Sequence, residues 1–153
     1  ADGRLHRNFQ GYTADQARAL LGFGASAISS LPEGYGQNVP SIAGYQNAVA
    51  EGRLPIVRGV AIDTEDRLRG AVIERLMCDL NVDVAALCTS HGKPVDHLQA
   101  EMETLEPLQS DDLIQMDGNH ITVTPDGRPL VRLVAAAFDR HLAKSEGRHS
   151  KAV

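Results

Sequence analysis

The strongest constraint on the fold is a helical run of apolar residues in the middle of the chain. An apolar residue stands at every fourth position, at Leu68, Val72, Leu76 and Leu80. This spacing places them on one face of an α-helix, and Asp63 or Thr64 can cap its start. We therefore predict a helix over residues 64–80 that buries this face against other elements.

The residues after this helix predict a short series of further elements. In order, these are a helix over 82–88, a third helix from Pro94 to Leu105, strands at 113–116 and 120–124, and a closing helix from about 128 to 142. Asp117-Gly118-Asn119 is a hairpin turn signal. The closing helix would bury Leu130, Leu133, Val134, Ala137, Phe138 and Leu142. Three helices, a hairpin and a closing helix are typical of a winged-helix-like domain.

The first 62 residues have a different composition. Nine of the fourteen glycines lie before residue 60, and five of the six aromatic residues lie in the first 45. We predict a short helix over 13–21, a loop with one short strand over 22–38, a helix capped by Ser41 and a strand over 54–62. The predicted fold class is α+β and mainly helical, with one part over 1–62 and a winged-helix-like domain over 63–153.

Charge and hydropathy exclude some classes of function. The formal net charge is −5, and no apolar run approaches the length of a membrane span. Residues 93–119, which include the third predicted helix, hold seven acids and one base. Nucleic-acid affinity depends on Lys and Arg contacts to phosphate, so we expect neither nucleic-acid nor membrane binding. A binding module that covers a protein partner or a substrate stays an alternative function.

The sequence offers weak candidates for chemistry. Cys78 and Cys88 are too few for a disulfide scaffold or a four-thiolate metal site, which suits a cytoplasmic protein. Cys88, His91 and His97 carry side chains that can ligate metals but follow no metal-binding motif, and we predict no metal ligands. Gly22-Phe-Gly-Ala-Ser-Ala27 matches a dinucleotide fingerprint, but the residues before it look helical rather than strand-like.

Several blocks resemble the oxygen-independent coproporphyrinogen III oxidases, which are radical S-adenosylmethionine (SAM) enzymes of haem biosynthesis. The most specific block is Leu-His-Arg-Asn-Phe-Gln-Gly-Tyr-Thr at 5–13. The likeness continues through Leu-Leu-Gly-Phe-Gly-Ala-Ser-Ala-Ile-Ser at 20–29, Tyr-Gly-Gln-Asn at 35–38, and the stretch from Val123 to Asp139. The likeness covers nearly the whole chain.

The resemblance implies a longer parent enzyme whose catalytic part is a partial (β/α) barrel. Its Cys-x3-Cys-x2-Cys motif would hold a [4Fe–4S] cluster, and this motif is absent from the 153 residues. The chain thus resembles a C-terminal fragment: residues 1–62 would end the catalytic domain, and 63–153 would form the C-terminal domain. We expect the fragment alone to be inactive, to bind no cofactor tightly and to tend to self-associate.

The resemblance also implies substrate, cofactors and site residues. The parent would bind two SAM molecules and the cluster, and would convert two propionates of coproporphyrinogen III to vinyl groups with the help of an electron acceptor. Phe9, Gln10 and Ile28 would lie near the second SAM, and no catalytic residue is assigned. A haem-carrying relative of the family stays a further alternative.

Overall fold

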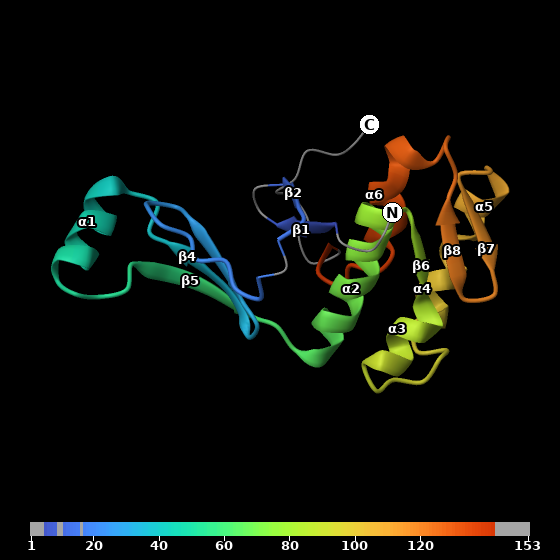
Figure 1. Cartoon of the computed structure of the whole chain (residues 1–153), viewed down its shortest axis with the longest axis horizontal. Coiled ribbons are helices and arrows are strands. Elements are labelled where there is room, and N and C mark those ends of the chain that lie inside the picture. The colour runs from blue at the N-terminus through green and yellow to red at the C-terminus, as the bar shows by residue number, and fades with distance from the viewer. Residues whose placement is uncertain (1–4, 9–10, 16, 143–153) are drawn as a thin grey trace. The chain divides into compact units, whose positions relative to one another are not determined.

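The computed structural model describes residues 5–8, 11–15 and 17–142. By their contacts, the residues group into two compact units. One unit comprises residues 15–65, and the other joins residues 1–14 to residues 66–153. Figure 1 labels most elements of both units, which are described separately below.

The unit of residues 15–65 contains an antiparallel three-stranded sheet and one helix. Strands β3 (Ile28–Leu31), β4 (Gly34–Asn38) and β5 (Ile56–Ala61) pair in that order. Helix α1 (Ile42–Ala50) connects β4 to β5, and the Ser41 side chain accepts a hydrogen bond from the Gly44 amide. The predicted Ser41-capped helix and the predicted strand after it are therefore confirmed.

Two predictions for this region are wrong. The segment 22–38, predicted as a loop with one short strand, contains two strands, because all four residues of β3 pair with β4 and only residues 22–27 remain a loop. The helix predicted over 13–21 is absent from the described residues of that segment. The main chain of Leu20 instead exchanges hydrogen bonds of 2.8 and 2.9 Å with Ser30, so pairing to the sheet edge overrides the local helix preference.

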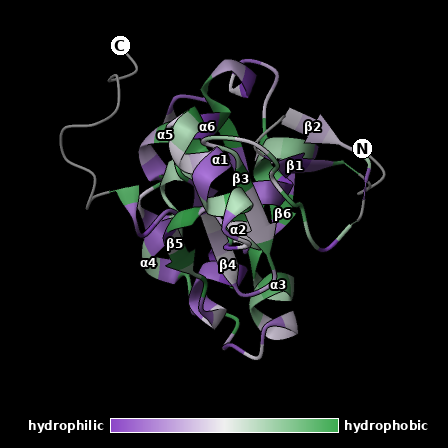
Figure 2. Ribbon diagram, turned by 90° about the vertical axis from the view of Figure 1, so that its left-hand side faces the viewer, coloured by the Kyte–Doolittle hydropathy of each residue, from purple (hydrophilic) through white to green (hydrophobic). Residues whose placement is uncertain are grey.

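Strand β5 exposes apolar residues throughout. All six of its residues are exposed, including Val57 and Val60, and β5 pairs only with β4 in the described sheet. Figure 2 colours the elements by hydropathy, with hydrophobic residues in green. Among the described residues, no helix has both the length and the hydropathy needed to span a membrane.

The second unit begins with a hairpin of β1 (His6–Asn8) and β2 (Gly11–Thr13). Its longest helix is α2 (Thr64–Asp79). The following elements are β6 (Asn81–Asp83), α3 (Val84–Ser90), α4 (Gln99–Glu103), α5 (Glu106–Ser110), β7 (Ile114–Asp117), β8 (His120–Val123), the 3-10 turn η1 (Arg128–Leu130) and α6 (Val131–Ala136). Strands β6, β8 and β7 form an antiparallel sheet in that order.

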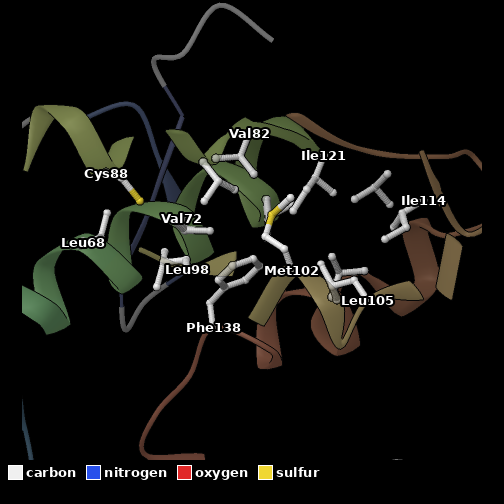
Figure 3. Close-up of a cluster of buried hydrophobic side chains, with 14 residues drawn as sticks. Leu68, Val72, Val82, Cys88, Leu98, Met102, Leu105, Ile114, Ile121 and Phe138 are labelled. Atoms are coloured by element: carbon white, nitrogen blue, oxygen red, sulfur yellow. The ribbon is translucent and has the colours of Figure 1, made fainter. Parts of the chain in front are cut away.

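The core of this unit contains the apolar face of α2. Leu68, Val72 and Leu76 are fully buried and pack with residues of α3, α4, β7, β8 and the C-terminal segment, including Phe138 (Figure 3). The fourth residue of the predicted face, Leu80, follows the helix in a left-handed conformation with φ of 61°. The prediction that this helix buries its apolar face is confirmed for Leu68, Val72 and Leu76.

Other boundaries differ from the predictions. The second helix begins at Val84 rather than Val82, because Asn81–Asp83 pairs with β8. The third begins at Gln99 rather than Pro94. The closing helix ends at Ala136, so Phe138 is buried from beyond the helix, while Leu133 and Leu142 are about half exposed. The α+β class is confirmed; the winged-helix-like description and the division into 1–62 and 63–153 stay predictions.

Candidate functional site

The loop before β3, residues 22–27, is held by several hydrogen bonds in the unit of residues 15–65. Gly24 and Ser26 have φ of 100° and 61°, so the loop turns sharply twice. The Gly22 amide donates a 3.0 Å hydrogen bond to the hydroxyl of Ser29 on β3. A Cβ atom at Gly22 would lie 2.7 Å from the carbonyl oxygen of Ile28, so only glycine fits there without movement.

Asn38, at the end of β4, holds this loop from inside the fold. Its side chain is buried, and its amide donates hydrogen bonds of 3.1 Å to the carbonyl of Gly22 and 2.9 Å to that of Gly24. The Ser26 amide donates to the carbonyl of Val39, at 3.0 Å. These bonds fix loop 22–27 to the strand that neighbours β3.

The loop leads directly into Ile28, which opens β3 and pairs with Gln37 of β4. Ile28 is half buried, so part of its side chain offers apolar surface. Phe23, in the middle of the loop, is 84% exposed. The sheet and Asn38 together set the position of Ile28 and its preceding loop.

In the other unit, the β1–β2 hairpin is attached to the C-terminal half of α2. Nδ1 of His6 lies 3.0 Å from Oε1 of Glu74. The Arg75 guanidinium donates to the carbonyl of Leu5 at 3.2 Å, and the Tyr12 hydroxyl donates to the carbonyl of Met77 at 3.4 Å. Residues more than sixty positions apart in the sequence thus lie side by side.

The two cysteines lie in this unit and are both buried free thiols. Burial, followed by the nearby charge of Glu74, raises the pKa of the Cys78 thiol. Cys78 therefore stays protonated at neutral pH, whereas a metal ligand must be a thiolate. Cys88 is fully enclosed in the core (Figure 3). Within residues 5–8, 11–15 and 17–142, no group of three or more His, Cys, Asp and Glu side chains could hold a metal ion.

Of the three residues predicted to lie near SAM, only Ile28 belongs to the described part of the chain. Ile28 lies at the start of β3, directly after the constrained loop. Phe9 and Gln10 lie outside the described residues, although the strands on either side of them are paired. Their convergence with Ile28 therefore stays a prediction.

Sequence reasoning missed the residues that support these positions. Asn38 and Ser29 are polar residues in a segment predicted as loop, and their burial depends on a hairpin that was not predicted. Glu74 and Arg75 contact a segment nearly seventy residues earlier, which no local pattern reveals. The paired glycines at 22 and 24 were the one available signal, because they indicate a close backbone approach.

Comparison with known proteins gives one consistent family. Residues 62–130 match the family model described as the HemN C-terminal domain. The chain is 46% identical over 149 residues to an oxygen-independent coproporphyrinogen III oxidase of Bradyrhizobium diazoefficiens, and 39% identical over 153 residues to that of Paracoccus denitrificans. These alignments cover 97% and 99% of the chain, but 33% of each relative.

A solved structure shows the same likeness. The chain matches coproporphyrinogen III oxidase (HemN) from Escherichia coli, described as a radical SAM enzyme, with a TM-score of 0.86 and 36% identity. The match covers 92% of this chain and 33% of the solved one. The chain therefore spans about a third of the length of these three proteins.

Proposed function

The chain belongs to the oxygen-independent coproporphyrinogen III oxidase family, in which it corresponds to a C-terminal part, and we propose that the complete protein is such an oxidase. Its reaction would remove a hydrogen atom, CO2 and an electron from each of two propionates of coproporphyrinogen III. The products would be two vinyl groups, and so protoporphyrinogen IX, in haem biosynthesis. The observation that carries this proposal is 46% identity to an oxidase of this name along 97% of the chain.

The radical chemistry would be supplied by SAM and a [4Fe–4S] cluster. The two cysteines do not fit a cluster site, because Cys88 is enclosed in the core and Cys78 is held as a neutral thiol. We therefore assign no cluster ligand to these 153 residues. The same reasoning supports the expectation that this chain is inactive by itself.

The chain's own contribution would be to bind the second SAM molecule. Phe9 and Ile28 have side chains that can pack on adenine or on methylene groups, and the Gln10 amide can both donate and accept hydrogen bonds. Ile28 suits this role because it is only half buried and follows a loop fixed by Asn38. A Cβ atom added at Gly24 would have no neighbour within 4 Å, so the loop is open to close approach there.

A substitution of Gln10 in the complete enzyme tests this assignment. Gln10→Ala should raise KM for SAM about tenfold, the effect of losing one or two hydrogen bonds to a ligand. Iron content should equal that of the unsubstituted enzyme, because Gln10 is not a cluster ligand. The matched control is Gln99→Ala, which removes the same type of side chain from α4 and should leave KM for SAM unchanged. Unchanged SAM kinetics in Gln10→Ala would reject the assignment.

The complete enzyme would pass electrons to an acceptor, act in the cytoplasm and bind neither nucleic acid nor membrane. The acidic stretch at 93–119 supports the absence of nucleic-acid binding. A gel-shift titration at low salt should show no tight DNA complex, and a submicromolar complex would favour the binding-module alternative instead.

A further inference from the structure

The β1–β2 hairpin is too short to hold its own orientation. Each strand has three residues, and its described backbone pairing extends from His6 with Thr13 to Asn8 with Gly11. An isolated two-stranded hairpin is at best marginally stable in water. The placement of this hairpin therefore depends on what its strands contact outside the pair.

Those contacts come from one short stretch of α2 and reach both strands. On the β1 side, Glu74 lies beside the His6 ring, and Arg75 donates to the carbonyl of Leu5. On the β2 side, the Tyr12 hydroxyl donates to the carbonyl of Met77. Carbonyls in the last turn of a helix lack a donor within the helix, so this bond also satisfies the end of α2.

The guanidinium of Arg75 is itself held in place. It donates a 2.6 Å hydrogen bond to Oδ2 of Asp79, one turn further along α2. The Asp79 side chain is 9% exposed, and its Oδ1 is buried without a hydrogen-bond partner among the described residues. A partly desolvated pair of this kind is stronger than a surface ion pair, so Arg75 presents a fixed donor to Leu5.

We propose that α2 positions the β1–β2 hairpin for SAM through the contacts of Glu74 and Arg75 and through the bond it accepts from Tyr12 of β2, so that the C-terminal domain takes part in cofactor binding. This inference rests on the proposed function, which assigns Phe9 and Gln10, between the two strands in sequence, to the second SAM. The three residues act as positioning residues and do not contact the cofactor. Helix α2 lies in the region matched over 62–130 and would thereby support the block at 5–13, which precedes it by more than fifty residues.

The test uses the complete enzyme with Tyr12→Phe, Glu74→Ala and the double variant. Tyr12→Phe removes one hydroxyl from a half-exposed ring, Glu74→Ala removes the partner of the His6 ring, and neither change leaves Asp79 without Arg75. Tyr45→Phe on α1 and Glu103→Ala on α4 are controls of the same chemistry. The measurements are the dissociation constant of SAM at equilibrium, KM for SAM against kcat, and amide hydrogen exchange over residues 5–13.

Each single variant should weaken SAM binding about threefold and the double variant about tenfold, as expected for lost hydrogen bonds of ordinary strength. KM for SAM should rise in parallel with the dissociation constant, while kcat stays within about twofold. Amide hydrogen exchange over residues 5–13 should become faster. The controls should leave all three values unchanged.

Gln10→Ala in the same assays separates the two proposals. If Gln10→Ala weakens SAM binding and the Tyr12 and Glu74 variants behave like their controls, the positioning role is wrong and the proposed function stands. If Gln10→Ala has no effect, Gln10 does not bind SAM, and both the assignment and the positioning role fail. A fall in kcat with unchanged SAM affinity would also overturn the positioning role.

Discussion

The side-chain amide of Asn38 donates a 2.9 Å hydrogen bond to the carbonyl of Gly24, and the same amide donates at 3.1 Å to Gly22. One buried side chain therefore satisfies two main-chain acceptors of a loop that turns through two left-handed residues. Buried polar groups that lose their partners retain the full cost of desolvation. This relationship makes Asn38 the residue on which the loop before Ile28 most depends.

Asn38→Ala should lower the free energy of unfolding by about 2 kcal/mol, because it leaves two carbonyl oxygens without donors. Asn38→Asp should cost more, since an ionised carboxylate can only accept and would face the same two oxygens. Denaturant unfolding of the variants measures the effect. Asn47→Ala on the exposed side of α1 is the matched control and should change stability by less than about 0.5 kcal/mol.

Gly22 and Gly70 should respond in opposite directions to the same substitution. An alanine Cβ at Gly22 would lie 2.7 Å from the Ile28 carbonyl oxygen, whereas nothing lies within 4 Å of one at Gly70, inside α2. Gly70→Ala should stabilise the fold by about 0.5–1 kcal/mol through helix propensity, and Gly22→Ala should destabilise it by about 1–3 kcal/mol. Thermal unfolding measures both, and a stabilised Gly22→Ala variant would contradict the close approach.

Sequence periodicity predicted the elements that depend on local pattern. The buried face of α2 and the Ser41 cap of α1 both follow from side chains a few residues apart. The two-residue connection between β7 and β8 follows from a Gly-containing turn. These features do not depend on contacts with distant residues, so the sequence alone predicts them.

The elements that were missed depend on pairing across the chain. Strand β6 has three residues, and it exists because it pairs with β8, where Asn81 lies opposite Thr122. Strand β4 reads Gly-Tyr-Gly-Gln-Asn, with low intrinsic strand preference, but it is the central strand of its sheet. The contacts of Asn38, Glu74 and Arg75 could not be predicted for the same reason, because their partners lie far away in the sequence.

Phe138 and Leu133 are both large apolar residues of the last described segment, but they differ in burial. Both belonged to the predicted buried face of the closing helix, but Phe138 is fully buried and Leu133 is about half exposed. Phe138→Ala should cost about 3–5 kcal/mol, since it removes a large side chain from the core. Leu133→Ala should cost less than about 1 kcal/mol. Denaturant unfolding of the two variants checks this, and equal losses would contradict the difference in burial between the two side chains.

Cys78 should contribute a pH dependence to stability on the alkaline side. Its pKa is raised above 9.0 by burial and then by Glu74, so the folded state binds the thiol proton more tightly than the unfolded state does. This contribution is complete below the unfolded pKa and is lost as the pH rises through the raised native pKa. The stability of the unsubstituted chain should therefore fall more steeply above pH 9.0 than that of Cys78→Ala. Parallel curves of unfolding free energy against pH would show that the thiol is not shielded.

The 153-residue chain by itself should self-associate through β5. This strand pairs only with β4 in its described sheet, and it exposes 61% of Val57 and 56% of Val60. An exposed apolar edge strand offers unpaired main-chain groups to a second copy, and a charged side chain on such an edge opposes that pairing. Val57→Lys should therefore shift sedimentation velocity profiles toward monomer at high protein concentration. Val95→Lys, which changes a similarly exposed valine before α4, should leave them unchanged. Monomer alone in the unsubstituted chain would show that β5 is not an association surface.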